Sequence, residues 1–183
     1  MSTAVDTKEG KLILDSHKLS YHMDRVQAWE SGERIAPISV DMALTRACGA
    51  MCTFCYAMVQ ESQERSSVKT PVALKLVDDF ERLGIRSVSL VSDGESTLSP
   101  AYVPFIKHAY DAGIDVGNGT NGWEWEPEKI EQVLPYLTWV RFTVAAGRPN
   151  TYADMMYKGP EQTQVFDRAM ANIKYAVDLK RRK

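Results

Sequence analysis

A short joint occurs twice in the chain: a helical stripe of apolar residues ends at a glycine, and an isoleucine then opens a β-prone run. The two joints are Gly84-Ile85 and Gly113-Ile114, so the strands that follow them begin about 29 residues apart. This spacing is typical of one strand–helix unit. Strands that alternate with helices pair in parallel through right-handed crossovers, so the repeat predicts an α/β fold with a parallel sheet.

The same pattern extends over most of the chain from Pro37 onward. We expect strands at 38–44, at 85–91, from 114 onward and at 139–144. We expect helices at the proline signals Thr70-Pro71, Ser99-Pro100, Pro127 and Gly159-Pro160. Successive units of this kind curl toward a TIM-like barrel. About four of them predict a partial, open TIM-like βα barrel with parallel strands.

Apolar residues at helical spacing indicate which faces of these helices are buried. In the first helix, Thr70 is expected as the N-cap with Pro71 at the first helical position, and Gly84 ends the helix. The inward residues expected in the second helix are Val103, Ile106 and Tyr110. Those expected on one face of the last helix are Phe166, Ala169, Met170, Ile173 and Val177.

Residues 1–36 precede this pattern and are expected to form an N-terminal extension, with the barrel-like domain at 37–183. Met1–Lys11 is polar and is expected to be loose. A short amphipathic helix is expected over roughly 19–31, on the outside of the domain. Its apolar residues at helical spacing are Leu19, Met23, Val26 and Trp29.

Composition restricts the classes of function that the chain can have. With 183 residues, it is long enough for one domain with a hydrophobic core. A net charge of −2 gives no indication of nucleic-acid binding. No apolar run reaches membrane-spanning length, and the polar N-terminus does not resemble a signal peptide. We therefore expect a cytoplasmic protein with no membrane partner.

All three cysteines of the chain lie in one stretch, Cys48-Gly-Ala-Met-Cys52-Thr-Phe-Cys55-Tyr56. Clustered cysteines in a reducing compartment indicate metal or redox chemistry rather than disulfides. Structural zinc sites and ordinary iron–sulfur clusters take four protein ligands, so three thiolates would leave one iron of a [4Fe–4S] cluster open. The alternative is zinc with a histidine as fourth ligand, but His17, His22 and His108 have no close ligand spacing to the cysteines.

In such a barrel the chemistry lies at the carboxyl ends of the strands. The four loops expected there are 48–56, 92–96, 118–122 and 145–148. The second loop contains Gly94, where the backbone can approach a ligand closely. The third contains Asn121-Gly122, which forms a turn and also has the position to line a pocket. Trp123 and Trp125, which follow it, are expected to pack in the interior rather than stack on a substrate.

The chain resembles the radical S-adenosylmethionine (SAM) enzymes, whose signature is a C-x3-C-x2-C loop with an aromatic residue just before the third cysteine, here Phe54. The resemblance implies that Cys48, Cys52 and Cys55 bind a [4Fe–4S] cluster. In that family the amino and carboxylate groups of SAM chelate the open iron. It also implies reductive cleavage of SAM to a 5′-deoxyadenosyl radical, which abstracts hydrogen from a substrate.

The resemblance extends to the later loops. Asp93-Gly94-Glu95 is similar to the family's glycine-glycine-glutamate motif, with aspartate in place of the first glycine, and that motif contacts the methionine amino group of SAM. Thr120-Asn121-Gly122 resembles the end of the family's third strand, and Thr143 lies where the fourth strand contributes to the SAM pocket. Phe54 and Tyr56 are expected on the adenine side of SAM. For Glu95 the alternative is a surface carboxylate at a helix N-terminus.

Two functions follow from this resemblance. The first is a radical SAM enzyme that acts on an unidentified substrate and takes electrons from a donor such as flavodoxin or ferredoxin. The second is a non-catalytic iron–sulfur or SAM-binding module, or a fragment that requires a partner. The family's barrel usually has six units and only about four are expected here. The strand at 139–144 is therefore expected to have an open edge, which favours self-association.

Overall fold

The computed structural model describes residues 3–7, 10–14, 18–58, 66–91, 93–157 and 163–182. Gly159-Pro160, the expected start of the last helix, and His17 lie outside these ranges. The chain divides into two compact units, Met1–Ala36 and Pro37–Lys183. No helix in the described ranges is long and apolar enough to cross a membrane.

The first unit begins with a β-hairpin. β1 (Thr3–Thr7) pairs antiparallel with β2 (Gly10–Leu14), so that Thr3 lies opposite Leu14 and Thr7 lies opposite Gly10. The prediction of a loose segment over Met1–Lys11 is therefore wrong for β1. The partner strand satisfies the backbone N–H and C=O groups of this polar segment, and polar composition alone does not reveal such a partner.

The helix expected at 19–31 is confirmed, in two pieces. η1 (Lys18–His22) is a 3-10 turn, and α1 (Met23–Glu30) continues it as an α-helix. α1 buries none of its residues, and Trp29 is 68% exposed. After the helix, the Arg25 guanidinium donates a hydrogen bond of 2.7 Å to the Ala36 carbonyl, which holds the end of this unit against α1.

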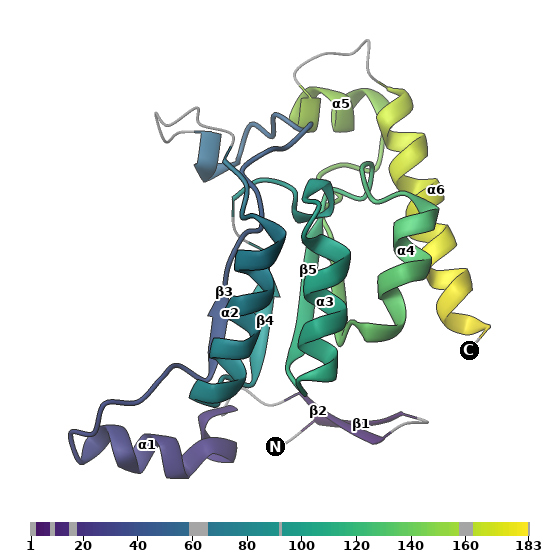
Figure 1. Ribbon diagram of the computed structural model, residues 1–183. Helices are drawn as coiled ribbons and strands as arrows, with labels where there is room; N and C mark the ends of the chain where they lie inside the picture. The colour runs from purple at the N-terminus through teal and green to yellow at the C-terminus, as the bar shows by residue number, and fades with distance from the viewer. Residues whose placement is uncertain are drawn as a thin grey trace. The chain divides into compact units, whose positions relative to one another are not determined.

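The second unit is built on a four-stranded parallel sheet in the order β3-β4-β5-β6 (Figure 1). The strands are β3 (Ser39–Asp41), β4 (Ser87–Leu90), β5 (Asp115–Thr120) and β6 (Trp139–Phe142). The predicted α/β fold with an open parallel sheet is confirmed. Three strands are shorter than predicted, because the residues at their ends already belong to the connecting loops.

Helices alternate with these strands. They are α2 (Thr70–Leu83), α3 (Tyr102–Asp111), α4 (Pro127–Val133), α5 (Pro149–Tyr157) and α6 (Gln164–Arg181). Short 3-10 turns lie at η2 (Tyr56–Met58), η3 (Ser96–Leu98) and η4 (Leu134–Tyr136). α5 was not predicted from the sequence, and it adds a short helix between β6 and the expected last helix.

Two details of the predicted helices are wrong. The N-cap of α2 is Lys69, one residue before the predicted Thr70, while Gly84 ends the helix with φ +71° as predicted. In α3 the buried face is formed by Tyr102, Phe105, Ile106 and Ala109. Tyr110 is 55% exposed, because it lies one position past that face, and its ring packs edge-on against Tyr136 at 5.1 Å.

The last helix also turns a different face inward from the one predicted. α6 buries Val165, Ala169, Asn172 and Ala176. Val177, predicted on the buried face, is 41% exposed, whereas Phe166 and Met170 are half-buried and pack on the core as expected. The predicted stripe is therefore shifted by about one residue around the helix, and it admits a polar residue, Asn172, whose amide donates to the Gly122 carbonyl at 2.8 Å.

The two faces of the sheet differ in character. Val88, Leu90 and Val116 point toward the helices and are fully buried in one apolar core with residues of α2 and α3. At the alternate positions of β3 and β4, the Ser87 hydroxyl donates to the Ser39 hydroxyl at 2.9 Å. Further along this face, the indole of Trp139 lies over the buried Gly117 and is itself 42% exposed. The helices thus cover one face of the sheet.

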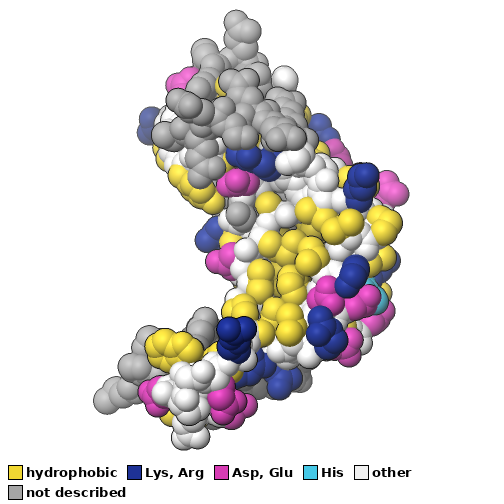
Figure 2. All heavy atoms as spheres, turned by 60° about the vertical axis from the view of Figure 1, so that its left-hand side comes forward, with side chains coloured by type: hydrophobic (Ala, Val, Ile, Leu, Met, Phe, Trp, Pro, Cys, Tyr) yellow, Lys and Arg dark blue, Asp and Glu magenta, His cyan; other side chains and the backbone are white. Residues whose placement is uncertain are grey.

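Apolar surface is also exposed elsewhere on this unit. Figure 2, which brings the β3 and α2 side of Figure 1 forward, shows hydrophobic side chains gathered over the middle of the face beside charged ones. The large exposed hydrophobic residues of α2 are Val72 and Leu83.

Candidate functional site

The three cysteines lie in the loop that follows β3, at the carboxyl end of the sheet. Cys48, Cys52 and Cys55 are free thiols, and each is half-buried. The loop begins at the fully buried Leu44 and is closed locally by a hydrogen bond of 3.1 Å from the Cys55 N–H to the Cys52 carbonyl. All three sulfurs are therefore carried by one anchored segment.

The cysteine loop is held on its other side by α5. The Met51 N–H donates to the Met156 carbonyl at 2.7 Å, and the Thr53 N–H donates to the Met155 carbonyl at 2.9 Å. The Cys52 sulfur lies 3.5 Å from the Met156 sulfur. A helix has free carbonyls in its last turn, and here two N–H groups of the cysteine loop satisfy them.

The apolar face of α5 forms a small core beneath this loop. Its buried members are Tyr152, Ala153, Met156 and Tyr157. Ala145 and Ala146, from the fourth predicted site loop, pack on the same core as Cys48 and Cys52. Sequence reading missed α5, although the spacing of its apolar residues was a helical signal.

The second predicted loop lies directly against the cysteine loop. The Glu95 N–H donates to the Ala47 carbonyl at 2.8 Å. Gly94 has φ +71°, and a Cβ at this position would lie 2.2 Å from the Thr45 carbonyl oxygen. Only glycine fits this approach without a shift of the backbone. Asp93, the position where the related motif has glycine, pairs with Arg46 at 3.6 Å.

Glu95 points its carboxylate into the protein. The side chain is 3% exposed, and it accepts hydrogen bonds from the Thr97 hydroxyl at 2.8 Å and from the Asn121 N–H at 2.8 Å. Burial raises the pKa of this carboxyl, and the hydrogen bonds act in the opposite direction. The hydrogen bond from the Asn121 N–H to the Glu95 carboxylate therefore holds the second loop against the third.

The third predicted loop begins later than expected, because Asn118, Gly119 and Thr120 belong to β5. The Thr120 hydroxyl accepts from the Gly122 N–H at 3.0 Å, and the Asn121 side chain accepts from the Trp123 N–H at 3.1 Å. These are the side chain–backbone bonds of a turn. The segment is thus a turn, and its connection to Glu95 also brings it to the site.

The remaining predicted site residues lie around this arrangement. Phe54 and Tyr56 are 53% and 59% exposed and belong to the far end of the cysteine loop. Thr143 follows β6, and its N–H donates to the Thr120 carbonyl at 2.9 Å. Trp125 is fully buried in the core, as predicted. Trp123 is half-buried, with the Arg168 guanidinium 4.6 Å from its ring centre.

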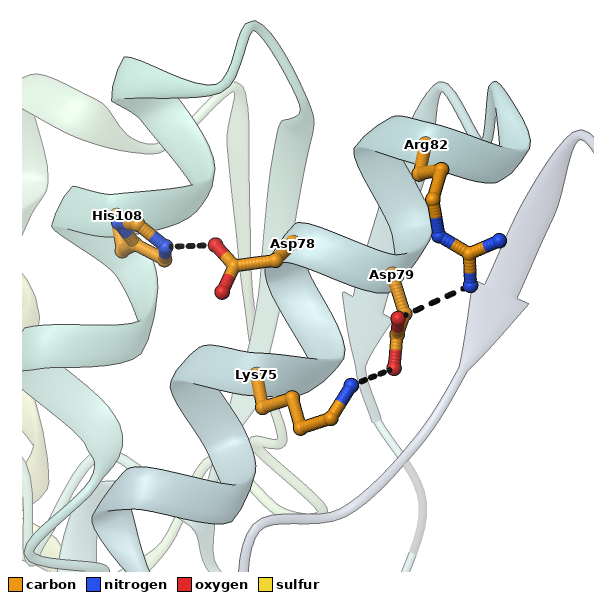
Figure 3. A network of polar contacts seen from close by, with 5 residues as sticks. All are labelled: Lys75, Asp78, Asp79, Arg82 and His108. Carbon is orange, nitrogen blue, oxygen red and sulfur yellow. Dashed lines mark hydrogen bonds and ion pairs between the residues drawn. The ribbon is translucent and has the colours of Figure 1, made fainter.

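Within the second unit, the histidine that the structure describes belongs to the helix layer. His108 on α3 pairs with Asp78 on α2 at 2.6 Å (Figure 3). On the same stretch of α2, Asp79 pairs with Lys75 at 2.8 Å and with Arg82 at 3.1 Å (Figure 3). The two hydrogen bonds lower the pKa of Asp79. This network is a surface feature of the helix layer.

The environment of Cys48 and Cys52 favours their protonated forms in the metal-free protein. Burial raises the pKa of Cys48 to about 12, and the carboxylates of Glu124 and Glu95 add to the effect. Burial, with the neighbouring Cys55, also raises the pKa of Cys52. Metal ligation requires thiolates, so binding of a cationic centre here is coupled to release of protons.

The residues present fit an iron–sulfur cluster. In the described part of the chain, no three His, Cys, Asp or Glu side chains are grouped closely enough to hold a metal ion, so the loop presents no preformed single-ion site. Its donor set is three thiols, which suits soft metals. Two buried donors, Trp123 Nε1 and Tyr157 Oη, have no hydrogen-bond partner in the same part of the chain. A sulfur-rich group would provide acceptors for them.

Comparisons with known proteins identify the family of the chain. The family model of the Radical SAM superfamily matches residues 42–182. The chain is 25% identical over 138 residues to an AdoMet-dependent heme synthase of Methanosarcina barkeri (strain Fusaro / DSM 804). The aligned region covers 75% of this chain and 38% of that protein. AdoMet is another abbreviation for SAM.

Solved structures share the fold. SuiB of Streptococcus suis bound to the precursor peptide SuiA gives a TM-score of 0.60 at 15% identity, over 86% of this chain and 36% of that one. anSMEcpe with bound AdoMet gives 0.59 at 16% identity, over 76% of this chain and 41% of that one. The chain thus spans about two fifths of the length of the relatives it matches.

Proposed function

Because the chain belongs to the Radical SAM superfamily, we propose that Cys48, Cys52 and Cys55 bind a [4Fe–4S] cluster and that the protein cleaves SAM reductively. When bound, such a cluster would supply one electron to the sulfonium of SAM, whose S–C5′ bond would break to give methionine and a 5′-deoxyadenosyl radical able to take a hydrogen atom from a substrate. Superfamily membership does not favour the alternative of a non-catalytic module.

The observation that carries the proposal is the position of the cysteine loop. It lies at the carboxyl end of a parallel sheet, where α/β proteins place their chemistry. Backbone bonds from Met51 and Thr53 fix it to α5, and the Ala47 carbonyl fixes it to the second loop. A loop anchored at both sides keeps three thiol ligands on one short segment, which favours their binding to one centre.

For SAM, we propose that the chain binds the cofactor across the first two loops. The rings of Phe54 and Tyr56 are exposed and have the size to cover an adenine. Gly94 and Glu95 are proposed to meet the amino group through their backbone, because the Glu95 carboxylate already accepts internal hydrogen bonds. Asp93 is proposed as a neighbouring negative charge.

On the other side, we propose that Thr120, Asn121 and Thr143 form the wall of the SAM pocket. The N–H of Thr143 bonds to the carbonyl of Thr120, which keeps the ends of β5 and β6 together. The substrate is unidentified, and the electron donor is proposed to be a flavodoxin or ferredoxin. A reducing cytoplasm is the compartment that suits three clustered thiols.

Anaerobic reconstitution with iron and sulfide tests the proposal. The expected product holds about four irons and four sulfides per chain and, with dithionite and SAM, releases 5′-deoxyadenosine and methionine. Cys48→Ala, Cys52→Ala and Cys55→Ala should each abolish this release. Stoichiometric zinc without iron uptake would remove the cluster, and a reduced, SAM-binding protein that makes no 5′-deoxyadenosine would remove the reaction.

A further inference from the structure

Two buried hydrogen-bond donors lie beside the cysteine loop and have no acceptor among the residues that the structure describes. Within the described ranges, Trp123 Nε1 and Tyr157 Oη are inaccessible to solvent and make no hydrogen bond. The other buried side chains with unpartnered polar atoms there are Tyr102, Asn118 and Trp125. Those residues belong to α3, β5 and the apolar core, whereas Trp123 and Tyr157 lie in the layer that also packs on Cys48 and Cys52.

The indole nitrogen of Trp123 is placed against the loop itself. It lies 3.4 Å from the position that a Cβ on Gly49 would occupy, and Gly49 directly follows Cys48. The carboxylate of Glu124 is also close to Gly49, because its Oε1 lies 2.2 Å from the same Cβ position. The Arg168 guanidinium stacks over the indole at 4.6 Å and holds the ring in place. The N–H is therefore fixed at the Cys48 end of the loop.

The hydroxyl of Tyr157 belongs to the same layer. Its ring packs edge-on against Trp123, with centroids 6.0 Å apart, and is 5% exposed. Burial raises the pKa of Tyr157 far above its usual value, and the charges of Tyr152, Glu124, Cys48 and Cys52 raise it further. The hydroxyl therefore keeps its proton at any physiological pH, and Tyr157 belongs to the small core on which Cys48 and Cys52 also pack.

Buried donors without acceptors are rare in folded proteins because they lose their bonds to water without compensation. Two of them at one loop indicate an acceptor that binds there. Thiolate and sulfide sulfurs accept hydrogen bonds, and such bonds are among the factors that set the potential of an iron–sulfur cluster. Cluster reduction adds negative charge, so a donor at sulfur stabilises the reduced state.

We propose that Trp123 Nε1 and Tyr157 Oη donate hydrogen bonds to sulfur atoms of the cluster at its Cys48–Cys52 side and raise its reduction potential. The Glu124 carboxylate, on the same side, acts in the opposite direction through its charge. This inference rests on the proposed function, since it requires the cluster. It assigns these residues to the setting of the potential and not to contact with substrate.

The test is an EPR-monitored redox titration of the reconstituted protein with Tyr157→Phe, which removes one oxygen atom and little else. We expect the ratio of reduced to oxidised cluster at a fixed potential to fall about three- to tenfold, where tenfold equals 59 mV for one electron. Tyr102→Phe is the matched control, because it removes from the core a buried hydroxyl that also has no partner among the described residues. Glu124→Gln should shift the ratio in the opposite direction.

A second readout identifies the bond directly. In deuterated buffer, ENDOR spectra of the reduced cluster should contain an exchangeable deuteron coupling that disappears in Tyr157→Phe and persists in Tyr102→Phe. Trp123→Phe should remove a different coupling. Equal potentials and unchanged couplings in proteins of equal iron content would overturn the inference.

Failures of folding or loading also have a defined meaning. The metal-free Tyr157→Phe protein should be as stable as the wild type, because the hydroxyl has no partner to lose in the described part of the chain. Clear destabilisation would contradict the inference. Loss of iron from a well-folded Tyr157→Phe protein, with iron retained in Tyr102→Phe, supports it. Absence of iron from the wild type would instead refute the proposed function.

Discussion

The carboxylate of Glu95 accepts a hydrogen bond of 2.8 Å from the Asn121 N–H, and this bond ties the loop after β4 to the end of β5. A second bond of 2.8 Å comes from the Thr97 hydroxyl. Glu95→Ala leaves these buried donors without a partner. We expect its free energy of unfolding to fall by about 2–3 kcal/mol, measured by urea unfolding of the metal-free protein.

Two further variants decide what Glu95 does. Glu81→Ala removes an exposed carboxylate from α2 and should change the free energy of unfolding by no more than about 0.5 kcal/mol. Glu95→Gln places an N–H₂ group against either the Thr97 hydroxyl or the Asn121 N–H. If Glu95 acts by holding the two loops together, stability and SAM affinity should fall together. A loss of SAM affinity at unchanged stability would instead indicate a direct contact between the carboxylate and SAM.

Alanine substitutions at Gly94 and Gly113 together test the close approach of the first two loops, with Gly113 as the matched control. Both have positive φ, at +71° and +70°, but only at Gly94 would a Cβ meet the backbone, 2.2 Å from the Thr45 carbonyl oxygen. Alanine at either position has the strain of the left-handed region, about 1–2 kcal/mol. Gly94→Ala should in addition displace the loop and reduce the iron bound after reconstitution.

Gly113→Ala should leave iron binding unchanged, because nothing lies within 4 Å of the added methyl group. Iron analysis and urea unfolding of the two variants side by side make the comparison. Equal losses in both would show that the contact between Gly94 and Thr45 does not position the cysteine loop.

Docking of α5 on the cysteine loop predicts a specific pattern of amide exchange. The N–H groups of Met51 and Thr53 bond to carbonyls of α5 and should be protected in the metal-free protein. Met156 is fully buried, so Met156→Ala should cost about 2–5 kcal/mol and accelerate exchange at both amides. Met156→Leu nearly conserves the volume and should cost less than about 1.5 kcal/mol.

Hydrogen exchange followed by mass spectrometry, together with the rate of iron loss to a chelator, measures these effects. Fast exchange at Met51 and Thr53 in the wild type would contradict the docking of α5. Slow exchange in Met156→Ala would show that the backbone bonds hold the loop without the side chain.

Alkylation of the metal-free protein tests the burial of Cys48. With its pKa raised from 9.0 to about 12, the thiolate fraction at pH 8 is lower by about a thousandfold, although a more basic thiolate is also more nucleophilic and recovers part of the rate. The rate at Cys48 should therefore keep rising by about tenfold per pH unit beyond pH 9. In the urea-unfolded protein it should level off near pH 9.

Iodoacetamide labelling with peptide mass mapping follows the rate at Cys48. A rate that levels off near pH 9 in the folded protein would show that Cys48 is open to water. The same deprotonation accompanies metal binding, so cluster assembly should be faster at pH 8.5 than at pH 7.

The parts of the fold that sequence predicted are those with local signals. Gly84 and Gly113 both have positive φ at the joints before β4 and β5. Glycine is the residue that favours this backbone conformation, so its place in the sequence marked the end of each helix and revealed the repeat of helix and strand. The spacing of the three cysteines likewise indicated a candidate metal-binding loop from the sequence alone. α5 was missed because it has only nine residues and follows a segment that had been predicted as a site loop.

Other features depend on contacts between distant residues and carry no local signal. Glu95 and Asn121 are 26 positions apart, so nothing in the sequence shows that the carboxylate turns inward to meet that backbone. The Met51–Met156 bond joins residues more than a hundred positions apart. Likewise, β1 becomes a strand only because β2 pairs with it. Tertiary pairing decided each of these features.

The open sheet predicts that the 183-residue protein associates with itself. In the part of the chain that the structure describes, β6 pairs only with β5 and β3 pairs only with β4, so each has a free edge. Helices cover one face of the sheet, and on the other face Trp139 lies over Gly117 and is 42% exposed. Free edges and exposed aromatic residues promote pairing between chains.

Size-exclusion chromatography with light scattering should therefore show dimers or larger species whose fraction rises with concentration in the micromolar range. Trp139→Glu places a charge on the uncovered face and should shift the protein toward monomer. Trp29→Glu is the matched control, because Trp29 is also exposed, at 68%, but belongs to the first unit. A monomer at all concentrations, or an equal effect of both substitutions, would show that the uncovered sheet face is not the contact.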